Sequence, residues 1–135
     1  MSGQLTPNFK VSEFKCKDGT EVPEEFLSNV QKLAENLQVL RDFIQKPIIV
    51  ISGYRSPKYN RKIGGARKSQ HLKAAAGDII VPGMHPDDVR DTIIKLIKEG
   101  KMAKGGVGRY TTFTHYDTRG WNARWSGSGV KDSRS

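Results

Sequence analysis

Two histidines and one aspartate in this chain have types and a spacing that suit a metal ion. His71 and Asp78 are related by a His-x6-Asp spacing, and His115 follows within residues 113–117. Two imidazoles and one carboxylate are a borderline ligand set, suited to a zinc ion that keeps a fourth position open for water. Bound zinc lowers the pKa of that water to about 7, which makes it a nucleophile at neutral pH. The three residues predict metal-assisted hydrolysis, although their spacing alone also arises by chance.

The residues around these candidate ligands form a longer pattern. Its most specific parts are Ser-Gly-Tyr-Arg at 52–55, Ser-x-His-x6-Asp at 69–78 and His-Tyr-Asp at 115–117. The pattern resembles the zinc D-alanyl-D-alanine carboxypeptidase family. Relatives of that family include the L-alanyl-D-glutamate endopeptidases of phage lysins and the murein endopeptidases that cut peptide crosslinks. The resemblance runs from Phe9 to Trp125, which is nearly the whole chain.

The resemblance implies roles for individual residues. The two histidines and the aspartate named above are expected to bind zinc. Arg55 is expected to contact the substrate or the developing oxyanion, for which a guanidinium fork is well suited. Ser69 and Asn60 are candidate substrate-binding residues, with a purely structural role at a turn as the alternative. For Arg55 the alternative is a salt bridge that braces a loop.

Two positions depart from the family pattern. Three residues after the first zinc His the pattern usually has Gly, and this chain has Ala74, so the turn must tolerate a methyl group and its backbone restriction. Several branches place an acid three residues before the second zinc His, and this chain has Thr112. Asp117 is the nearest carboxylate, and in a strand over 113–118 it shares a face with His115. A related branch also carries His-x-Asp. We therefore predict that Asp117 is the catalytic base. The equal alternative is that Asp117 orients the zinc-binding His115 through a hydrogen bond.

Length and composition limit the architecture. At 135 residues and 15.1 kDa, the chain is expected to form one zinc peptidase domain over 1–126, followed by a flexible tail over 127–135. No apolar run approaches the roughly 20 residues that cross a membrane, so no membrane insertion is expected. The first residues do not read as a secretory signal. A wall enzyme made in the cytoplasm would then act after release, as a phage lysis protein does, or be carried in a virion.

The formal net charge of +9 favours contact with polyanions. Nucleic acid and the acidic bacterial envelope are the two classes that this charge allows. Arg119, Trp121, Arg124 and Trp125 alternate charge with aromatic rings, as single-strand binders do. Trp125 also matches an Ala-Arg-Trp ending of the peptidase family, which favours packing in the core or in a groove wall. No nucleic-acid partner is therefore expected.

The spacing of apolar residues predicts an α+β fold: one small domain with an antiparallel sheet and flanking helices around the zinc site. The resemblance implies the same architecture, that of the hedgehog and D-Ala-D-Ala peptidases. His85 is predicted to cap a helix, and Tyr54 and Cys16 are predicted to pack in the interior. Helices are predicted at 24–45, 57–62 and 86–99, and strands at 47–51, 77–81, 105–110 and 113–118, the last two as a hairpin.

These features together predict a monomeric zinc metallopeptidase that hydrolyses peptide bonds in peptidoglycan stem peptides or crosslinks, in an endolysin or virion setting. Carboxypeptidase and endopeptidase action are both open, because loops around the groove select the bond. The alternative is a catalytically inactive, zinc-containing module that binds the wall or serves as a structural part of a virion. A nucleic-acid binder is the further rival, and it would bind DNA without zinc and with a steep dependence on salt.

Overall fold

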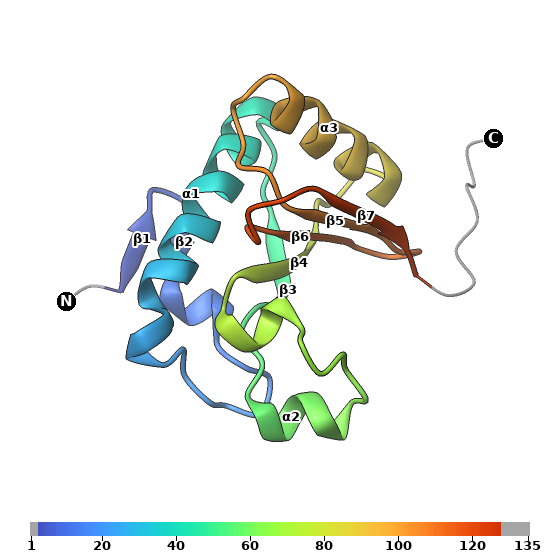
Figure 1. Cartoon of the computed structure of the whole chain (residues 1–135). Helices are drawn as coiled ribbons and strands as arrows, with labels where there is room; N and C mark the ends of the chain where they lie inside the picture. The colour runs from blue at the N-terminus through green and yellow to red at the C-terminus, as the bar shows by residue number, and fades with distance from the viewer. Residues whose placement is uncertain (1–2, 128–135) are drawn as a thin grey trace.

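The longest helix of the computed structural model, which describes residues 3–127, follows the predicted apolar spacing (Figure 1). This helix, α1 (Leu27–Ile44), buries one apolar face in the core. The predicted start at residue 24 is instead a short 3-10 turn, η2 (Glu24–Phe26), with Pro23 before it. Gln45 has a left-handed backbone with φ of 57°, and this conformation ends the helix.

A five-stranded sheet has the strand order β3-β4-β6-β5-β7. Neighbouring strands are antiparallel, except that β7 runs parallel to β5. The predicted α+β class and the β5–β6 hairpin are confirmed, whereas β7 and its parallel pairing were not predicted. The strand bounds are β3 (Ile49–Ser52), β4 (Ala76–Ile80), β5 (Gly106–Arg109), β6 (Thr114–Asp117) and β7 (Ala123–Ser126).

Two helices cover one face of this sheet and leave the other face for the site. Helix α3 (Pro86–Lys98) packs beside α1, and both contact the strands (Figure 1). Side chains alternate along a strand, so Ile79 and Tyr116 lie in the core with the helices. Their strand neighbours Asp78 and His115 therefore point to the opposite face.

The N-terminal segment supports the end of β3. Strands β1 (Gln4–Thr6) and β2 (Phe9–Lys10) form a small antiparallel pair, followed by a 3-10 turn, η1 (Val11–Phe14). A Cβ atom on Gly53 would lie 2.7 Å from the Cα atom of Phe14, so glycine permits this close approach. The backbone amide of Tyr54 also donates to the carbonyl of Phe14 at 2.7 Å. The Ser-Gly-Tyr-Arg segment is therefore held against η1.

The chain then forms α2 (Pro57–Lys62), as predicted, with Ser56 as its N-cap. A third 3-10 turn, η3 (Gln70–Lys73), precedes β4. Ala74 follows this turn in a left-handed conformation, with φ of 57° and ψ of 28°. The turn thus keeps the geometry that Gly would favour, at a local cost of about 1–2 kcal/mol. The methyl group of Ala74 is buried in the core, which offsets part of that cost.

The predictions for His85, Tyr54 and Cys16 are confirmed. The ring Nδ1 atom of His85 accepts the backbone amide of Asp87 at 3.0 Å at the start of α3, so His85 caps that helix. Tyr54 and Cys16 are both buried in the core. No helix within residues 3–127 is long and apolar enough to cross a membrane. The predicted tail lies, from residue 128 onward, outside the described residues.

Candidate metal centre and active site

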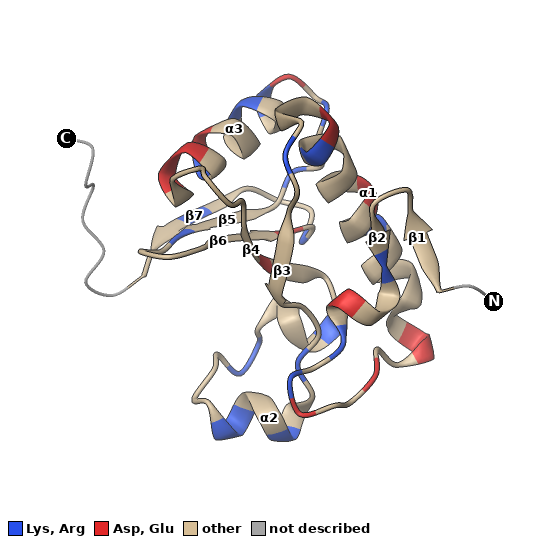
Figure 2. Cartoon of the chain, turned by 180° about the vertical axis from the view of Figure 1, so that it is seen from behind, with Lys and Arg blue, Asp and Glu red and all other residues tan. Residues whose placement is uncertain are grey.

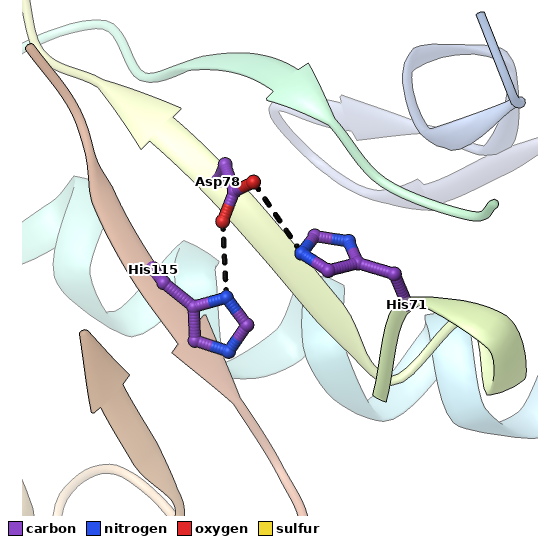
Figure 3. Close-up of side chains that lie close together, drawn as sticks. All are labelled: His71, Asp78 and His115. Carbon is purple, nitrogen blue, oxygen red and sulfur yellow. Dashed lines mark hydrogen bonds and ion pairs between the residues drawn. The ribbon is translucent and has the colours of Figure 1, made fainter. Parts of the chain in front are cut away.

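The three predicted ligands meet at one point on the face of the sheet opposite the helices. His71 comes from η3, Asp78 from β4 and His115 from β6 (Figure 3). One ligand atom from each of them lies within 4.8 Å of the other two, and all three side chains are buried. In Figure 3 the carboxylate of Asp78 lies between the two imidazoles. The structure therefore brings together the residues that the sequence singled out.

Strand register places two of these ligands side by side. Asp78 on β4 and His115 on β6 are directly paired across the antiparallel ladder. Residues paired in this way have Cβ atoms about 4.5–5.5 Å apart and point to the same face. The Oδ1 atom of Asp78 lies 3.0 Å from Nδ1 of His115, and its Oδ2 atom lies 3.4 Å from Nε2 of His71.

His71 is held both at its backbone amide and at its ring. Its backbone amide donates to Oγ of Ser69, and its Nδ1 atom lies 2.7 Å from the carbonyl oxygen of Gly53. Nδ1 must donate in that contact, which leaves the lone pair of Nε2 facing the Asp78 carboxylate. Nε2 is buried and has no hydrogen-bond partner. A buried polar atom of this kind requires an explanation, and a cation between Nε2 and the carboxylate supplies one.

His115 is oriented by a second carboxylate. Its Nε2 atom lies 2.7 Å from Oδ2 of Asp117, which therefore accepts the Nε2 proton. The other ring nitrogen, Nδ1, is then directed at Asp78, where a metal ion can take the place of a proton. A carboxylate on the outer nitrogen of a metal-binding histidine is a common arrangement, because it fixes the ring and raises its basicity. The donor set thus fits a zinc ion held by two imidazole nitrogens and one carboxylate.

The electrostatics of the cluster favour a bound cation. Burial raises the pKa of the Asp78 carboxyl, but the neighbouring side chains of His115 and His71 outweigh burial and hold this pKa well below its usual range. Burial likewise raises the pKa of Asp117, and hydrogen bonds from His115, Arg119 and Gly106 hold it well below its usual range. Burial lowers the pKa of His115, whereas the two neighbouring carboxylates raise it above its ordinary value. Two ionised carboxylates therefore face a buried pair of imidazoles.

Asp117 has both carboxylate oxygens engaged. Oδ1 accepts the backbone amide of Gly106 at 2.8 Å and the backbone amide and Nε of Arg119 at 3.1 and 2.9 Å. Oδ2 accepts Nη2 of Arg119 at 2.8 Å in addition to the His115 ring. The side chain of Asp117 is fully buried. The predicted shared face with His115 is confirmed. The contact of Arg119 with Asp117 was missed, since the alternation of Arg119 with the tryptophans had been considered only as a nucleic-acid-binding pattern.

Arg55 borders the cluster, and the two other substrate-binding candidates differ in position. Nη2 of Arg55 lies 3.5 Å from Oδ2 of Asp78, and its buried Nε atom has no hydrogen-bond partner. Ser69 lines the cavity that opens over the cluster, and its hydroxyl accepts a hydrogen bond from the backbone amide of His71. Asn60 is buried and donates to the carbonyl of Ala66, which braces the loop before η3. Asn60 is not among the residues that line the cavity.

A cavity of about 470 Å³ opens over the cluster, within the range of small-ligand sites. Tyr110, Phe113 and Trp125 form an aromatic wall. The rings of Tyr110 and Phe113 stack with centroids 4.5 Å apart, and Nε1 of Trp125 donates to the hydroxyl of Tyr110 at 2.9 Å. The Trp125 ring also lies 4.9 Å from that of His115. Of the two environments predicted for Trp125, the core or a groove wall, the structure shows the groove wall.

Comparison with known proteins agrees with this geometry. The chain matches the family model described as Peptidase M15 over residues 6–117, which is most of its length. The chain belongs to the peptidase M15 family. This membership confirms the predicted peptidase family. Residues 52–55, 69–78 and 115–117, which carry the site, all fall inside the matched part.

Three curated relatives are similar to this chain over part of their length. It is 36% identical over 81 residues to the proteins named peptidoglycan L,D-endopeptidase MepK of Escherichia coli strain K12, Escherichia coli O157:H7 and Shigella flexneri. The alignment covers 55% of this chain and 41% of each relative. The chain therefore spans about two fifths of the length of the curated relatives that it matches.

Proposed function

We propose that this M15 protein hydrolyses peptide bonds of bacterial peptidoglycan at a zinc ion held by His71, Asp78 and His115. The observation that carries the proposal is the convergence of these side chains, with an unpartnered Nε2 atom of His71, on the floor of a cavity. Zinc, when bound, supplies a Lewis acid and a water of lowered pKa. The relatives' printed name supports an L,D peptide bond as the first bond to test.

The chain's own residues would orient the substrate and the metal ligands and keep water from part of the site. The Asp78–Arg55 contact at 3.5 Å holds a guanidinium beside the cluster, where it binds a substrate carboxylate or the developing oxyanion. The ring of Trp125 covers His115 and keeps water from that side of the imidazole. Ser69 holds the amide of His71 and so fixes the first ligand at the turn.

For Asp117 we propose a positioning role rather than the role of base. A base must offer a free lone pair within reach of the water proton. Both oxygens of Asp117 are instead engaged by Gly106, Arg119 and His115, and the side chain has no exposed surface. Asp117 therefore holds the proton on Nε2 of His115 and leaves Nδ1 for the metal.

One observation favours a second candidate function, a zinc-containing wall-binding module without hydrolysis. Thr112 occupies the position where several branches of the family have an acid, and its side chain is not among those that line the cavity. Among the described residues that line the cavity, the only carboxylate belongs to Asp78. A binding module would keep the metal and the wall affinity and lack turnover.

Mass spectrometry of digested peptidoglycan separates the two functions. The zinc-loaded protein is incubated with purified sacculi and with soluble crosslinked muropeptides, and released products identify the bond. His71→Ala serves as the control that lacks a ligand. Products from the wild type alone support the peptidase. Full zinc occupancy without products from several wall chemotypes contradicts it and leaves the binding module. The endolysin or virion setting stays a prediction, which detection of the protein in purified virions would test.

A further inference from the structure

A second cavity lies on the other face of the sheet, beside the strand that carries Trp125. It has a volume of about 870 Å³ and is formed between α3 and strands β5 and β7. Its apolar part comes from Ile94, Ile97 and Val107. We call it the basic groove. It is lined by Arg90, Ile94, Ile97, Lys98, Lys104, Val107, Asn122, Arg124, Trp125 and Ser126.

The groove is strongly positive. Four of its residues are cationic, namely Arg90, Lys98, Lys104 and Arg124, and none of the described residues that line it is acidic. Figure 2 shows basic positions on α3 and on the strands beside it. Arg90 is paired with Asp91 on the helix surface at 2.7 Å. The two lysines and Arg124 are exposed, so their charges are accessible to a ligand.

Arg124 is fixed in place before any ligand arrives. Its Nη1 atom donates to the carbonyl oxygens of Gly105 and Ala123 at 2.6 and 2.9 Å, and its Nη2 atom donates to Oδ1 of Asn122 at 3.3 Å. All three acceptors are neutral, so they orient the guanidinium without cancelling its charge. A guanidinium oriented in this way loses little rotamer freedom when it binds a carboxylate.

The basic groove and the metal-site cavity share a wall. Trp125 lines both of them, because β7 is an outer strand of the sheet and a large residue on it can border both faces at the edge. Gly108 pairs with Trp125 across the strands, and a Cβ atom there would lie 2.6 Å from the indole ring. The glycine thus lets the ring lie flat at the edge. A ligand in the cavity can continue around β7 into the groove.

We propose that the basic groove binds the carboxylates of a peptidoglycan stem peptide next to the one held at the metal site. The inference rests on the proposed function, because that function places an acidic, repeating peptide polymer at the adjacent cavity. Each exposed ion pair is weak by itself. Several of them on a polymer already held nearby act at high effective concentration. The groove therefore favours intact wall over a short soluble fragment.

Two matched charge reversals test this inference. Lys98→Glu/Lys104→Glu alters the groove, and Lys32→Glu/Lys46→Glu alters exposed lysines that line neither cavity. Each double variant lowers the formal net charge by four, from +9 to +5. Co-sedimentation of zinc-loaded protein with purified sacculi measures binding without any need for turnover. The groove variant should bind on the order of tenfold more weakly, and the control should bind within about twofold of the wild type.

Turnover provides the second measurement. The ratio of kcat/KM on sacculi to kcat/KM on a short soluble muropeptide should fall for the groove variant and not for the control. Arg124→Gln should lower wall binding in the same direction, which guards against a folding defect in the double variant. Equal binding losses in groove and control variants would show a net-charge effect and overturn the inference. A groove variant that loses affinity for DNA while it keeps its affinity for sacculi would also overturn the inference. Binding losses confined to the groove with no turnover by the wild type would reject the proposed hydrolysis alone.

Discussion

Replacing Asp117 by Asn tests whether this carboxylate positions His115 or acts as the base. The carboxylate accepts five hydrogen bonds, from Gly106, Arg119 and His115. An amide has one oxygen, and its nitrogen cannot accept a hydrogen bond. If the nitrogen replaces Oδ2, the two bonds from Nη2 of Arg119 and from the His115 ring are lost. If it replaces Oδ1, the three bonds from Gly106 and Arg119 are lost, so at least two bonds disappear in either case.

The structure gives the expected magnitude. Hydrogen bonds to charged groups contribute roughly 1.5–3 kcal/mol each. The side chain of Arg119 is 20% exposed, so water replaces part of what it loses. We expect the free energy of unfolding to fall by about 2–4 kcal/mol, a Tm decrease of roughly 5–15 °C for a domain of this size. Zinc affinity should fall by roughly 10–100-fold, because His115 loses the partner that directs Nδ1.

Chelator competition and thermal unfolding measure the two effects on the same preparation. Added zinc should restore much of the turnover of Asp117→Asn if the residue only positions His115. Asp91→Asn makes the same chemical change at a surface aspartate of α3 and should leave zinc affinity unchanged. Near-normal zinc affinity together with turnover that saturating zinc does not restore would refute the positioning role and assign the base to Asp117.

Three further outcomes are expected. The purified protein should hold about one zinc ion per chain by elemental analysis, and His71→Ala, Asp78→Ala and His115→Ala should each lose it; full occupancy in any two would reject the site. Arg55→Lys keeps the charge and loses the planar fork, so kcat/KM should fall roughly 10–100-fold with little change in Tm; an unfolded or fully active variant would indicate a structural role. Because the pKa of His115 is raised in the folded metal-free chain, its protonation stabilises the fold fully below about pH 6.5, and this contribution is lost as pH rises through the folded value. Chemical unfolding of the metal-free protein should give a lower free energy at about pH 9 than at about pH 6, and His115→Gln should reduce that difference; an unchanged difference would locate the titration elsewhere.

Local patterns in the sequence were sufficient for the main helices and for the identity of the ligands. The apolar spacing of α1 reports burial directly, since one face of the helix must leave water. The β-branched run of β3 indicates a strand by residue type, although its side chains are exposed or half-buried. The His-x6-Asp and His-Tyr-Asp segments indicate metal binding by the types of their side chains, since His and Asp are common zinc ligands. The start of the first helix was predicted three residues too early, at residue 24. The 3-10 turn at 24–26 has the same spacing of polar and apolar residues as the helix that follows it.

Ala123 to Ser126 does alternate apolar and polar residues, but strand β7 was missed because the run is only four residues long and its partner, β5, is not its neighbour in the sequence. The parallel pairing of β7 with β5 depends on how the chain folds back, and no pattern within residues 123–126 predicts it. The left-handed Ala74 shows the same limit, since the surrounding turn imposes a conformation that its own side chain disfavours.

The sequence by itself determined which residues can bind the metal, because ligand chemistry belongs to the side chain. It also indicated that Asp117 shares a face with His115, because strand alternation is a local rule. Only the tertiary structure decided what Asp117 does there. Its donors come from Gly106 on β5 and from Arg119 beyond β6, and strand pairing and the turn bring them to one carboxylate. His115 and Arg119 are each two residues from Asp117, and Gly106 lies on the paired strand. Spacing alone does not show that these side chains and this amide all point at one carboxylate, so the choice between base and partner could not be made from the sequence.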